Sequence, residues 1–329
     1  MASASGACRK VAASRILFVT SSRIGDAVLS TGLLAHLART HPQARFTVAC
    51  GPATAPLFAP APFVARVIPM PKRRRAGHWF ALWRQTAAIW WSMVVDLRGS
   101  AIAYLLPTMA RRVLKSSWAP RHRLLHLSSA LGLDTAFAPV LWNSAAEEAE
   151  AAALIPAGPV LAVGPTANWG AKQWPAERFA AVVGRLTAPD GILAAAKVVV
   201  FGAESERAVA EPLLAALPPG RGIDLVGRVG LTTVHACLKR CSFYLGNDSG
   251  LMHIAAAAGV PTLGLFGPSS EVFYGPWGEH CASVRGPRSF EDICHAPDYD
   301  YRSQDCMMMD LTVEAVTDAA EALWRRNRL

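Results

Sequence analysis

The chain has 329 residues, of which 52% are hydrophobic and only 17% are charged, so it is long enough for two domains that each bury a core. No run of about 18 uncharged apolar residues occurs, so hydropathy predicts no membrane span. The first apolar run, residues 16–20, is too short for a signal peptide and is typical of a first strand. We therefore expect a cytoplasmic protein whose seven cysteines are reduced thiols.

Charge divides the chain into two unequal halves. Residues 1–150 carry 18 Lys and Arg against six Asp and Glu, a balance of +12, whereas residues 151–329 carry 15 against 18, a balance of −3. Nucleic acid, an anionic membrane face or an acidic substrate would each explain this asymmetry. A surface charged only for solubility would explain the net charge of +9 but not its uneven distribution.

The first half alternates between short apolar runs and amphipathic segments, which predicts strands followed by helices. The strands are predicted at residues 15–20, 45–50, 65–68 and 93–97. The helices are predicted at residues 29–40, 78–91 and 121–131. Residues 143–159 are rich in Ala and Glu, are then punctuated by Pro and Gly, and lack strand character, so we place the domain boundary there.

The same alternation starts again in the second half. Strands are predicted at residues 160–163, 197–201, 241–245 and 260–266, and helices at 175–186, 204–217, 249–258 and 312–326. We expect an α/β protein with two Rossmann-like domains, each a doubly wound parallel sheet, spanning residues 1–155 and 156–310. Their ligand sites should face a shared cleft at the carboxyl ends of the strands. The helix within residues 311–329 is a candidate to pack back on the first domain.

The strongest motif is GNDSGLMHIAAAAGVPTLGLFG at residues 246–267, where a strand ends and a helix begins. The free N–H groups at the start of this helix form an anion site, and Gly250 lets a pyrophosphate approach the backbone. Asp248 and Ser249 precede the helix, and His253 lies about one turn inside it, where it can donate a hydrogen bond. The alternative is that Asp248 or Ser249 is a plain N-cap and that His253 packs in the core.

Two further polar loops follow strands in the second half. GPTANWGAKQWPAERF at residues 164–179 places Lys172 before a helix, where a cation suits a diphosphate whose charge grows during bond cleavage. Thr166 and Asn168 add a hydroxyl and an amide to this loop. FGAESER at residues 201–207 places Glu206 after a strand, where an acid can bind ribose hydroxyls. The alternatives are a solvated lysine and an exposed acid favoured by the helix dipole.

Asp26 lies in TSSRIGDAVL at residues 20–29, at the entrance of the first helix. A carboxylate that faces the cleft can take the proton of an acceptor hydroxyl, and a helix N-terminus favours the ionised carboxylate. The alternative is that Asp26 serves only to start the helix.

At these stretches the chain resembles glycosyltransferase family 9, the ADP-heptose:lipopolysaccharide heptosyltransferases. The family pattern has a GD loop after the first strand, a DLxG strand end, a KxWPxxxF block, and a DSGxxH block followed by a GxP strand. This chain has them in the same order, as Gly25-Asp26, Asp96-Leu97-Arg98-Gly99, Lys172-Gln173-Trp174-Pro175 with Phe179, and Asp248-Ser249-Gly250 with His253. The resemblance implies the GT-B fold and an inverting, metal-independent transfer from a nucleotide sugar, commonly ADP-heptose.

The resemblance also implies roles for individual residues. Asp26 is the candidate base. The nucleotide-sugar donor is expected to contact Thr166, Asn168, Lys172, Glu206, Asp248, Ser249, Gly250 and His253. The acceptor is expected to be the lipopolysaccharide core or a similar lipid-linked anionic saccharide, and no cofactor is expected beside the donor.

Two candidate metal sites are set aside. Cys294, His295 and Cys306 lack the short spacings and the fourth ligand of a zinc site. Residues 298–300 spell the DxD motif of metal-dependent glycosyltransferases, but they lie in a polar loop near the C-terminus and not after a strand of the nucleotide domain.

The segment PKRRRAGHWFALWR at residues 71–84 joins four adjacent cations to three aromatic residues, which is typical of binding to an anionic membrane surface or a phosphorylated lipid. The cations predicted to contact the acceptor or the inner face of the cytoplasmic membrane are Arg23, Lys72, Arg73, Arg74, Arg75 and Arg98. No nucleic-acid-binding motif accompanies the segment, so nucleic acid is not expected as a partner. The alternative is a solvated loop with its aromatic residues packed inward.

Two other functions fit part of the pattern. A GT-B relative that uses another nucleotide sugar, either a different transferase or a 2-epimerase, would share the donor site, although an epimerase needs no acceptor and hence no cationic first domain. A non-catalytic nucleotide-sugar-binding or membrane-binding protein would keep the phosphate site without needing Asp26.

Overall fold

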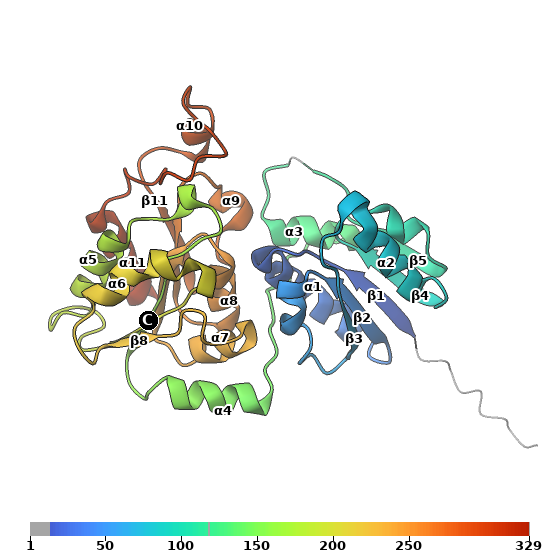
Figure 1. Ribbon diagram of the computed structural model, residues 1–329, viewed down its shortest axis with the longest axis horizontal. Helices are drawn as coiled ribbons and strands as arrows, with labels where there is room; N and C mark the ends of the chain where they lie inside the picture. Colours follow the sequence, from blue (N-terminus) through green and yellow to red (C-terminus); the bar gives the residue numbers. More distant parts are fainter. Residues whose placement is uncertain (1–13, 118, 329) are drawn as a thin grey trace, which may run out of the picture.

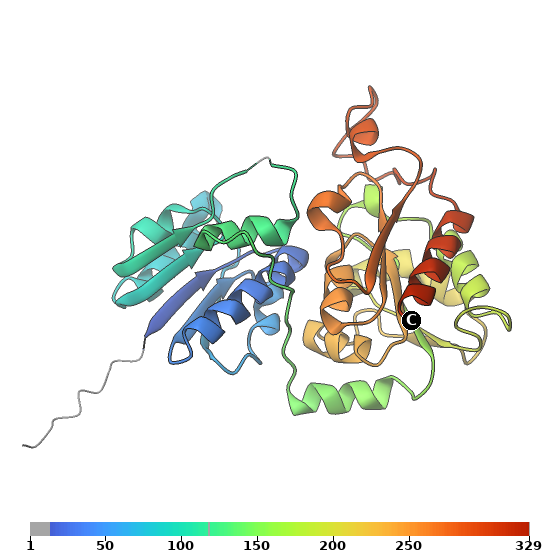
Figure 2. The ribbon, with the colours of Figure 1, turned by 180° about the vertical axis from the view of Figure 1, so that it is seen from behind.

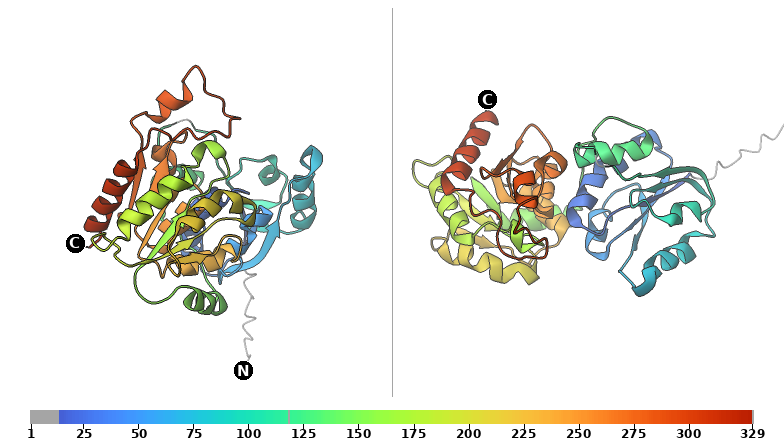
Figure 3. Two further views of the ribbon diagram at one scale, coloured as in Figure 1. Left: turned by 60° about the vertical axis from the view of Figure 1, so that its left-hand side comes forward. Right: turned by 90° about the horizontal axis from the view of Figure 1, so that it is seen from above.

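The computed structural model describes residues 14–117 and 119–328, which form two α/β domains side by side (Figure 1). Residues 1–13 of the predicted first domain lie outside the described residues. Seen from above, each domain has a sheet covered by helices, and the two domains meet along one side (Figure 3). None of the helices in the described ranges is long and apolar enough to cross a membrane.

The first domain is built on a parallel sheet in the order β3-β2-β1-β4-β5. Its strands are β1 (Arg15–Val19), β2 (Arg45–Cys50), β3 (Val64–Pro69), β4 (Trp91–Asp96) and β5 (Thr108–Val113). Its helices are α1 (Ile24–Thr40), η1 (Pro52–Leu57), η2 (Arg74–Ala76), α2 (Gly77–Thr86), η3 (Ala101–Tyr104), α3 (Arg123–Ser128) and η4 (Ser129–Leu131). Strand β1 is apolar on both faces because helices cover both sides of the sheet: Ile16 and Phe18 belong to the core under α1, Leu17 and Val19 to the core under α2.

The second domain repeats this plan with a six-stranded parallel sheet in the order β11-β10-β9-β6-β7-β8. Its strands are β6 (Val160–Gly164), β7 (Lys197–Val200), β8 (Gly222–Asp224), β9 (Phe243–Asn247), β10 (Thr262–Phe266) and β11 (Cys281–Arg285). Its helices are η5 (Gly170–Lys172), α5 (Ala176–Leu186), η6 (Glu204–Glu206), α6 (Arg207–Ala216), α7 (Leu231–Leu238), α8 (Gly250–Ala258), α9 (Glu271–Tyr274), α10 (Phe290–Cys294) and α11 (Val313–Arg326). The predicted pair of doubly wound parallel sheets is confirmed.

The connection between the domains is a helix, α4 (Ala145–Leu154), within the segment predicted as the boundary. A capping box between Ser144 and Glu147 starts it. Figure 2 shows α4 below the second domain after an extended stretch that leaves the first. Its acids bind α7, since Thr233 donates to Glu150 at 2.9 Å and Lys239 to Glu148 at 2.6 Å. Residues 145–154, assigned by sequence to the first domain, therefore pack with the second.

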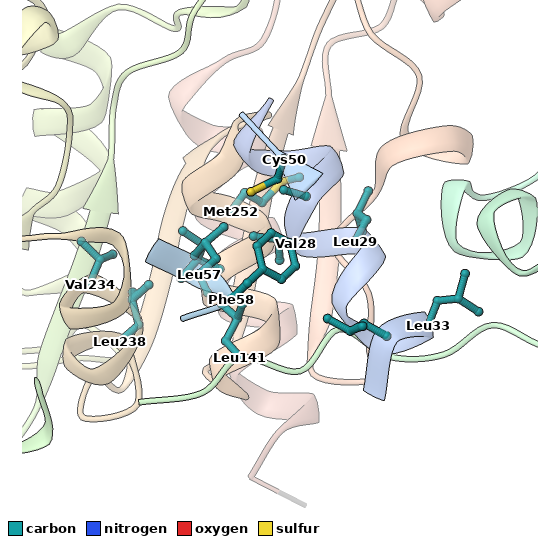
Figure 4. Packing of buried hydrophobic residues seen from close by; sticks show 14 of the residues in the cluster. Val28, Leu29, Leu33, Cys50, Leu57, Phe58, Leu141, Val234, Leu238 and Met252 are labelled. Atoms are coloured by element: carbon teal, nitrogen blue, oxygen red, sulfur yellow. The ribbon is translucent and has the colours of Figure 1, made fainter. Parts of the chain in front are cut away.

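One apolar cluster crosses from the first domain to the second. Figure 4 shows Val28 and Leu57 of the first domain near Met252 of the second, and all three belong to a single buried cluster. Helix α1 and η1 contribute the first-domain side, and α7 and α8 contribute the other. This contact holds the start of α1 against the start of α8, which fixes the geometry of the cleft.

Three details of the predicted elements differ in the structure. The helix predicted at residues 78–91 ends at Thr86, and Trp91 already begins β4. Strands β5, β8 and β11 were not predicted, because the edge strand β5 carries two arginines and β8 has only three residues. Helix α11 packs on α5, β10 and β11 of the second domain, so the expectation that it packs back on the first domain is wrong. Its apolar face, with Val316, Ala320 and Leu323, completes the second domain's outer core.

Candidate active site between the two domains

The site motifs lie at the points where the strand order of each sheet reverses. In the first sheet these are the ends of β1 and β4, and in the second the ends of β6 and β9. In open parallel sheets ligands bind at the carboxyl ends of the strands beside this reversal. The loop after β1 leads into α1, the loop after β9 leads into α8, and the two helices approach each other across the cleft.

Two glycines allow the starts of these helices to touch. A Cβ atom at Gly250 would lie 2.7 Å from Ile24 Cγ2 and 3.3 Å from the Gly25 backbone nitrogen. A Cβ atom at Gly25 would lie 2.9 Å from His253 Cδ2. The GD loop and the DSGxxH block are therefore in direct contact, and larger residues at either glycine would push the domains apart.

Three buried polar atoms around this contact have no hydrogen-bond partner among the described residues: Asp26 Oδ1, Ser249 Oγ and His253 Nδ1. Ser249 is the N-cap residue of α8, but its side chain makes no capping hydrogen bond. Buried polar groups are almost always paired in folded proteins. These three are therefore candidates for binding a ligand that enters between the domains.

His253 is a neutral residue in this environment. Burial lowers its pKa to about 4, against the opposing effect of nearby Asp248. It can donate or accept a hydrogen bond at neutral pH, but it does not add positive charge to the site.

Positive potential on the donor side comes from Lys172 and the helix start. Lys172 Nζ donates to Asp248 Oδ2 at 2.5 Å, and the carboxylate is almost fully buried. The lysine ends η5, whereas the aspartate follows β9, so the pair ties the KxWPxxxF block to the DSGxxH block. Buried Asn247 makes a second tie, because its Nδ2 donates to the Pro165 carbonyl oxygen at 2.8 Å and its Oδ1 accepts from the Trp174 backbone N–H at 3.2 Å.

Thr166 and Glu206 form a neighbouring polar group at the ends of β6 and β7. Thr166 Oγ1 donates to Glu206 Oε2 at 2.8 Å, and the Ala203 backbone N–H donates to the same oxygen at 2.9 Å. Glu206 thus keeps its second oxygen for other partners. Asn168, by contrast, is exposed, and its side chain makes no hydrogen bond to these residues in the described part of the chain.

On the first-domain side, Asp26 opens into a cavity of about 370 Å³, and four of its ten lining residues are cations. The cations of the lining are Arg23, Lys72, Arg98 and Arg123, and Asp26 is the only carboxylate in it. Arg123 Nε lies 3.4 Å from Asp26 Oδ1, an ion pair without hydrogen-bond geometry. This arrangement attracts an anionic molecule and presents one carboxylate to it.

Only one of the four cations of segment 72–75 lies at this cavity. Lys72 lines it, whereas Arg73, Arg74 and Arg75 are exposed and outside its lining. Arg75 and Ala76 have φ values of 50° and 56°, so the chain turns sharply away before α2. Of the six cations predicted from sequence, Arg23, Lys72 and Arg98 thus lie together at the cleft and three do not.

The DLxG motif shapes one wall of the cavity. Asp96 at the end of β4 is fully buried, and burial raises its pKa. Its carboxyl oxygens accept the backbone N–H groups of Arg98 and Ser100, both at 2.8 Å. This carboxyl group folds the loop that carries Arg98 and does not face the ligand space.

Three residues near the site were not predicted from the sequence. Arg123 starts α3, Tyr274 ends α9 with its hydroxyl pKa raised by burial and then by Asp26, and His122 Nε2 donates across the cleft to the Gly275 carbonyl oxygen at 2.9 Å. None lies in a recognisable motif: Arg123 reaches Asp26 because α3 packs on α1 within the first domain, and only the docking of the domains brings Tyr274 near Asp26. Within residues 14–117 and 119–328, no group of three His, Cys, Asp or Glu side chains could hold a metal ion.

The model of glycosyltransferase family 9 (heptosyltransferase) matches residues 121–296, more than half of the chain. Lipopolysaccharide heptosyltransferase 2 of Salmonella typhimurium is 28% identical, covering 82% of this chain and 88% of its own. Two solved structures share the fold. The family 9 glycosyltransferase of Veillonella parvula has a TM-score of 0.78 at 22% identity and covers 96% of this chain and 98% of its own. The E. coli ADP-heptose LPS heptosyltransferase II has a TM-score of 0.71 at 24% identity and covers 96% and 100%. The chain is a glycosyltransferase and belongs to glycosyltransferase family 9, the heptosyltransferase family.

Proposed function

We propose that the chain transfers heptose from ADP-heptose, with inversion at the anomeric carbon, to a hydroxyl of a lipid-linked anionic saccharide of the lipopolysaccharide core. The observation that carries this proposal is the position of Asp26. Its Oδ1, which faces Arg123 but has no hydrogen-bond partner among the described residues, lies between a cationic cavity and the start of α8, whose Ser249 and His253 also have polar atoms without a hydrogen-bond partner. A base with an acceptor pocket on one side and an anion site on the other is what glycosyl transfer needs.

The donor side fits a nucleoside diphosphate sugar. The N–H groups at the start of α8 and the ammonium of Lys172 suit the diphosphate, and they are positioned before the reaction begins. Glu206, held by Thr166, suits the ribose hydroxyls. ADP-heptose is chosen because the E. coli enzyme of this fold is named for it and the family is described as heptosyltransferases.

The acceptor side fits a negatively charged saccharide. Arg23, Lys72 and Arg98 surround the cavity together with Arg123, and guanidinium groups bind carboxylates and phosphates through paired hydrogen bonds. Relatives such as lipopolysaccharide heptosyltransferase 2 are named for lipopolysaccharide, whose core is anchored in lipid. The reaction is therefore proposed at the inner face of the cytoplasmic membrane, with the protein bound peripherally.

The chemistry follows from these contacts. Asp26 accepts the proton of the acceptor hydroxyl as its oxygen attacks the anomeric carbon, while the bond from that carbon to the diphosphate oxygen breaks. The electron pair of the broken bond stays with ADP, where Lys172 and the helix start stabilise the growing charge. Attack opposite the leaving group inverts the anomeric configuration in a single step. A second carboxylate for a two-step retaining route is absent from the lining of the acceptor cavity.

We also propose that no metal ion takes part. The α8 start and Lys172 supply the positive potential that a metal would otherwise give the leaving diphosphate. His253 is neutral, so its part is a hydrogen bond and not a charge.

The test is a transfer assay with defined donors and acceptor. The purified protein is incubated with ADP-heptose, GDP-mannose or UDP-glucose and a core saccharide that lacks heptose, and nucleoside diphosphate release and product are followed by mass spectrometry. We expect turnover with ADP-heptose and an inverted anomeric configuration by NMR. Turnover with another nucleotide sugar alone, or retention of configuration, would contradict the proposal.

A further inference from the structure

The outer layer of the first domain exposes large apolar side chains that the proposed chemistry does not use. Phe80 of α2, Tyr104 and Leu105 at η3, and Met109 of β5 are each 61–76% exposed, and Trp83 of α2 is 37% exposed. Single exposed apolar residues are common, but a group on adjoining elements marks an interaction site. We call these five residues the apolar face.

The apolar face is continuous across three elements. Phe80 and Trp83 stack one turn apart on α2, with ring centroids 5.9 Å apart. Trp83 Nε1 donates to the Leu105 carbonyl oxygen at 3.3 Å, which joins α2 to η3. Arg111 of β5 donates to the carbonyl oxygens of Ala103 at 2.8 Å and Leu106 at 3.2 Å.

Met109 and Arg111 are two positions apart and project from the same side of β5, so Met109 lies on the side that η3 covers. Figure 1 shows α2 and β5 next to each other at the end of the molecule away from the second domain.

The surroundings of the apolar face are cationic. Residues 71–112 contain eight Lys and Arg, whereas Asp96 is the only acid between residues 27 and 133, and it is fully buried. Arg73, Arg74, Arg75, Arg84 and Arg112 are exposed. The surface therefore combines an apolar centre with charges of one sign.

We propose that the apolar face docks on the interface of an anionic lipid bilayer, with the surrounding arginines binding lipid headgroups. Aromatic and aliphatic side chains enter the headgroup boundary, and nearby arginines are attracted to anionic lipid. A second copy of the chain is a poor occupant, because a two-fold contact would bring the same cations together. Trp79 takes no part, since it packs with the core under α2 and below the guanidinium of Arg98, 5.7 Å from its ring centroid.

Arg98 also connects helix α2, which carries part of the apolar face, to the acceptor cavity. Its guanidinium lies over Trp79 of α2, and it lines the cavity with Lys72. Docking of α2 and η3 would therefore bring the cavity close to the membrane surface. This last step rests on the proposed lipid-linked acceptor, whereas the docking itself does not.

The experiment compares two sets of exposed apolar residues, one in each domain. One variant carries Phe80→Gln, Leu105→Gln and Met109→Gln. The control carries Tyr301→Gln and Met309→Gln, which remove exposed apolar side chains of the second domain. Flotation is measured with vesicles of phosphatidylglycerol and phosphatidylethanolamine and with vesicles of phosphatidylcholine, at low and high salt. Transfer is measured with ADP-heptose and either a vesicle-bound acceptor or the same saccharide freed of its lipid.

We expect the parent and the control to float with the anionic vesicles. The partition coefficient of the triple variant on these vesicles should be lower than that of the parent by roughly tenfold or more. This loss of binding should persist at high salt because apolar contacts cause it. Its kcat/KM should fall with the vesicle-bound acceptor and stay unchanged with the free saccharide. A separate Arg73→Gln, Arg74→Gln, Arg75→Gln variant should lose mainly the salt-sensitive part.

Two results would overturn the docking proposal. One is flotation of the triple variant equal to that of the parent. The other is a parent that is dimeric by light scattering and becomes monomeric in the triple variant without a change in flotation. A protein that floats as expected but transfers no heptose would contradict only the proposed function, so the two failures are distinguishable.

Discussion

Replacing Lys172 with Met should lower both the stability of the folded protein and its affinity for the donor. The lysine is the cation paired with Asp248, whose side chain is only 6% exposed. Removing one partner of a buried pair costs about 3–5 kcal/mol. Because a fifth of the lysine side chain is exposed and the start of α8 still faces Asp248, we expect the free energy of unfolding to fall by about 2 kcal/mol.

The loss of donor affinity has a separate origin. A hydrogen bond to a charged group contributes about 1.5–3 kcal/mol, so loss of the lysine–diphosphate contact should raise the Kd for ADP by roughly thirtyfold, or about 2 kcal/mol. Isothermal titration calorimetry with ADP measures this value, and urea unfolding measures the stability. Adding Asp248→Asn to Lys172→Met should restore most of the stability, because no unpaired carboxylate remains, without restoring ADP affinity.

A matched control is available in Lys239, which donates to Glu148 at 2.6 Å but with both side chains about 40% exposed. Exposed pairs contribute little, so Lys239→Met should lower stability by less than about 1 kcal/mol and leave ADP binding unchanged. An unchanged Kd for ADP in Lys172→Met would refute the assignment of this lysine to the diphosphate. A stability loss as small as the control's would refute the account of the buried pair.

Three further predictions concern the helix contact, pH and metal. Gly250→Ala should lower the free energy of unfolding by about 1–3 kcal/mol in urea because its methyl group meets Ile24, whereas Gly184→Ala in α5, with open space around it, should be neutral or stabilising; equal effects would contradict the close contact. The pKa of His253 is lowered to about 4 in the folded protein, so the unfolded chain binds a proton at this residue more readily, and the free energy of unfolding should fall by up to about 3 kcal/mol as pH drops from about 6.5 to 4. The free energy of unfolding of His253→Gln should fall by correspondingly less over this range. Parallel curves of stability against pH for the parent and the variant would refute this cause. Transfer should survive exhaustive chelation with EDTA, and activity restored only by manganese or magnesium would contradict the metal-free proposal.

Sequence predicts the parts of this fold whose signal is local. Strands β1 and β6 are uninterrupted apolar runs buried on both faces, and such runs between polar loops are typical of parallel sheets. The edge strand β5 reads TMARRV, and its residues are half-buried or exposed because one of its sides has no neighbouring strand, so neither apolar content nor alternation marks it. Tertiary packing determines that this segment forms a strand, and packing cannot be read from a window of five or six residues.

The residues of the site likewise fall into those with a local sequence signal and those without one. The positions of Asp26, Lys172 and Asp248 beside the cleft could be predicted because each lies in a loop that follows a strand or in the first turn of a helix, where chain direction alone points toward the cleft. Arg123 reaches Asp26 through the packing of α3 on α1, and Tyr274 comes near Asp26 only when the two domains dock, so nothing in their own sequence neighbourhood marks them.

The measurement that tests the central claim most directly is single-turnover heptose transfer by Asp26→Asn, with ADP affinity measured on the same sample. The amide keeps the shape of the side chain but cannot take a proton, and because Oδ1 of Asp26 has no hydrogen-bond partner among the described residues, the change disturbs only its ion pair with Arg123 at 3.4 Å. We predict a rate lower by a factor on the order of 100–10,000, the usual contribution of a general base, with the Kd for ADP within about twofold of the parent. Transfer that falls less than tenfold, or that falls only in proportion to lost ADP binding, would contradict the role of Asp26 as the base.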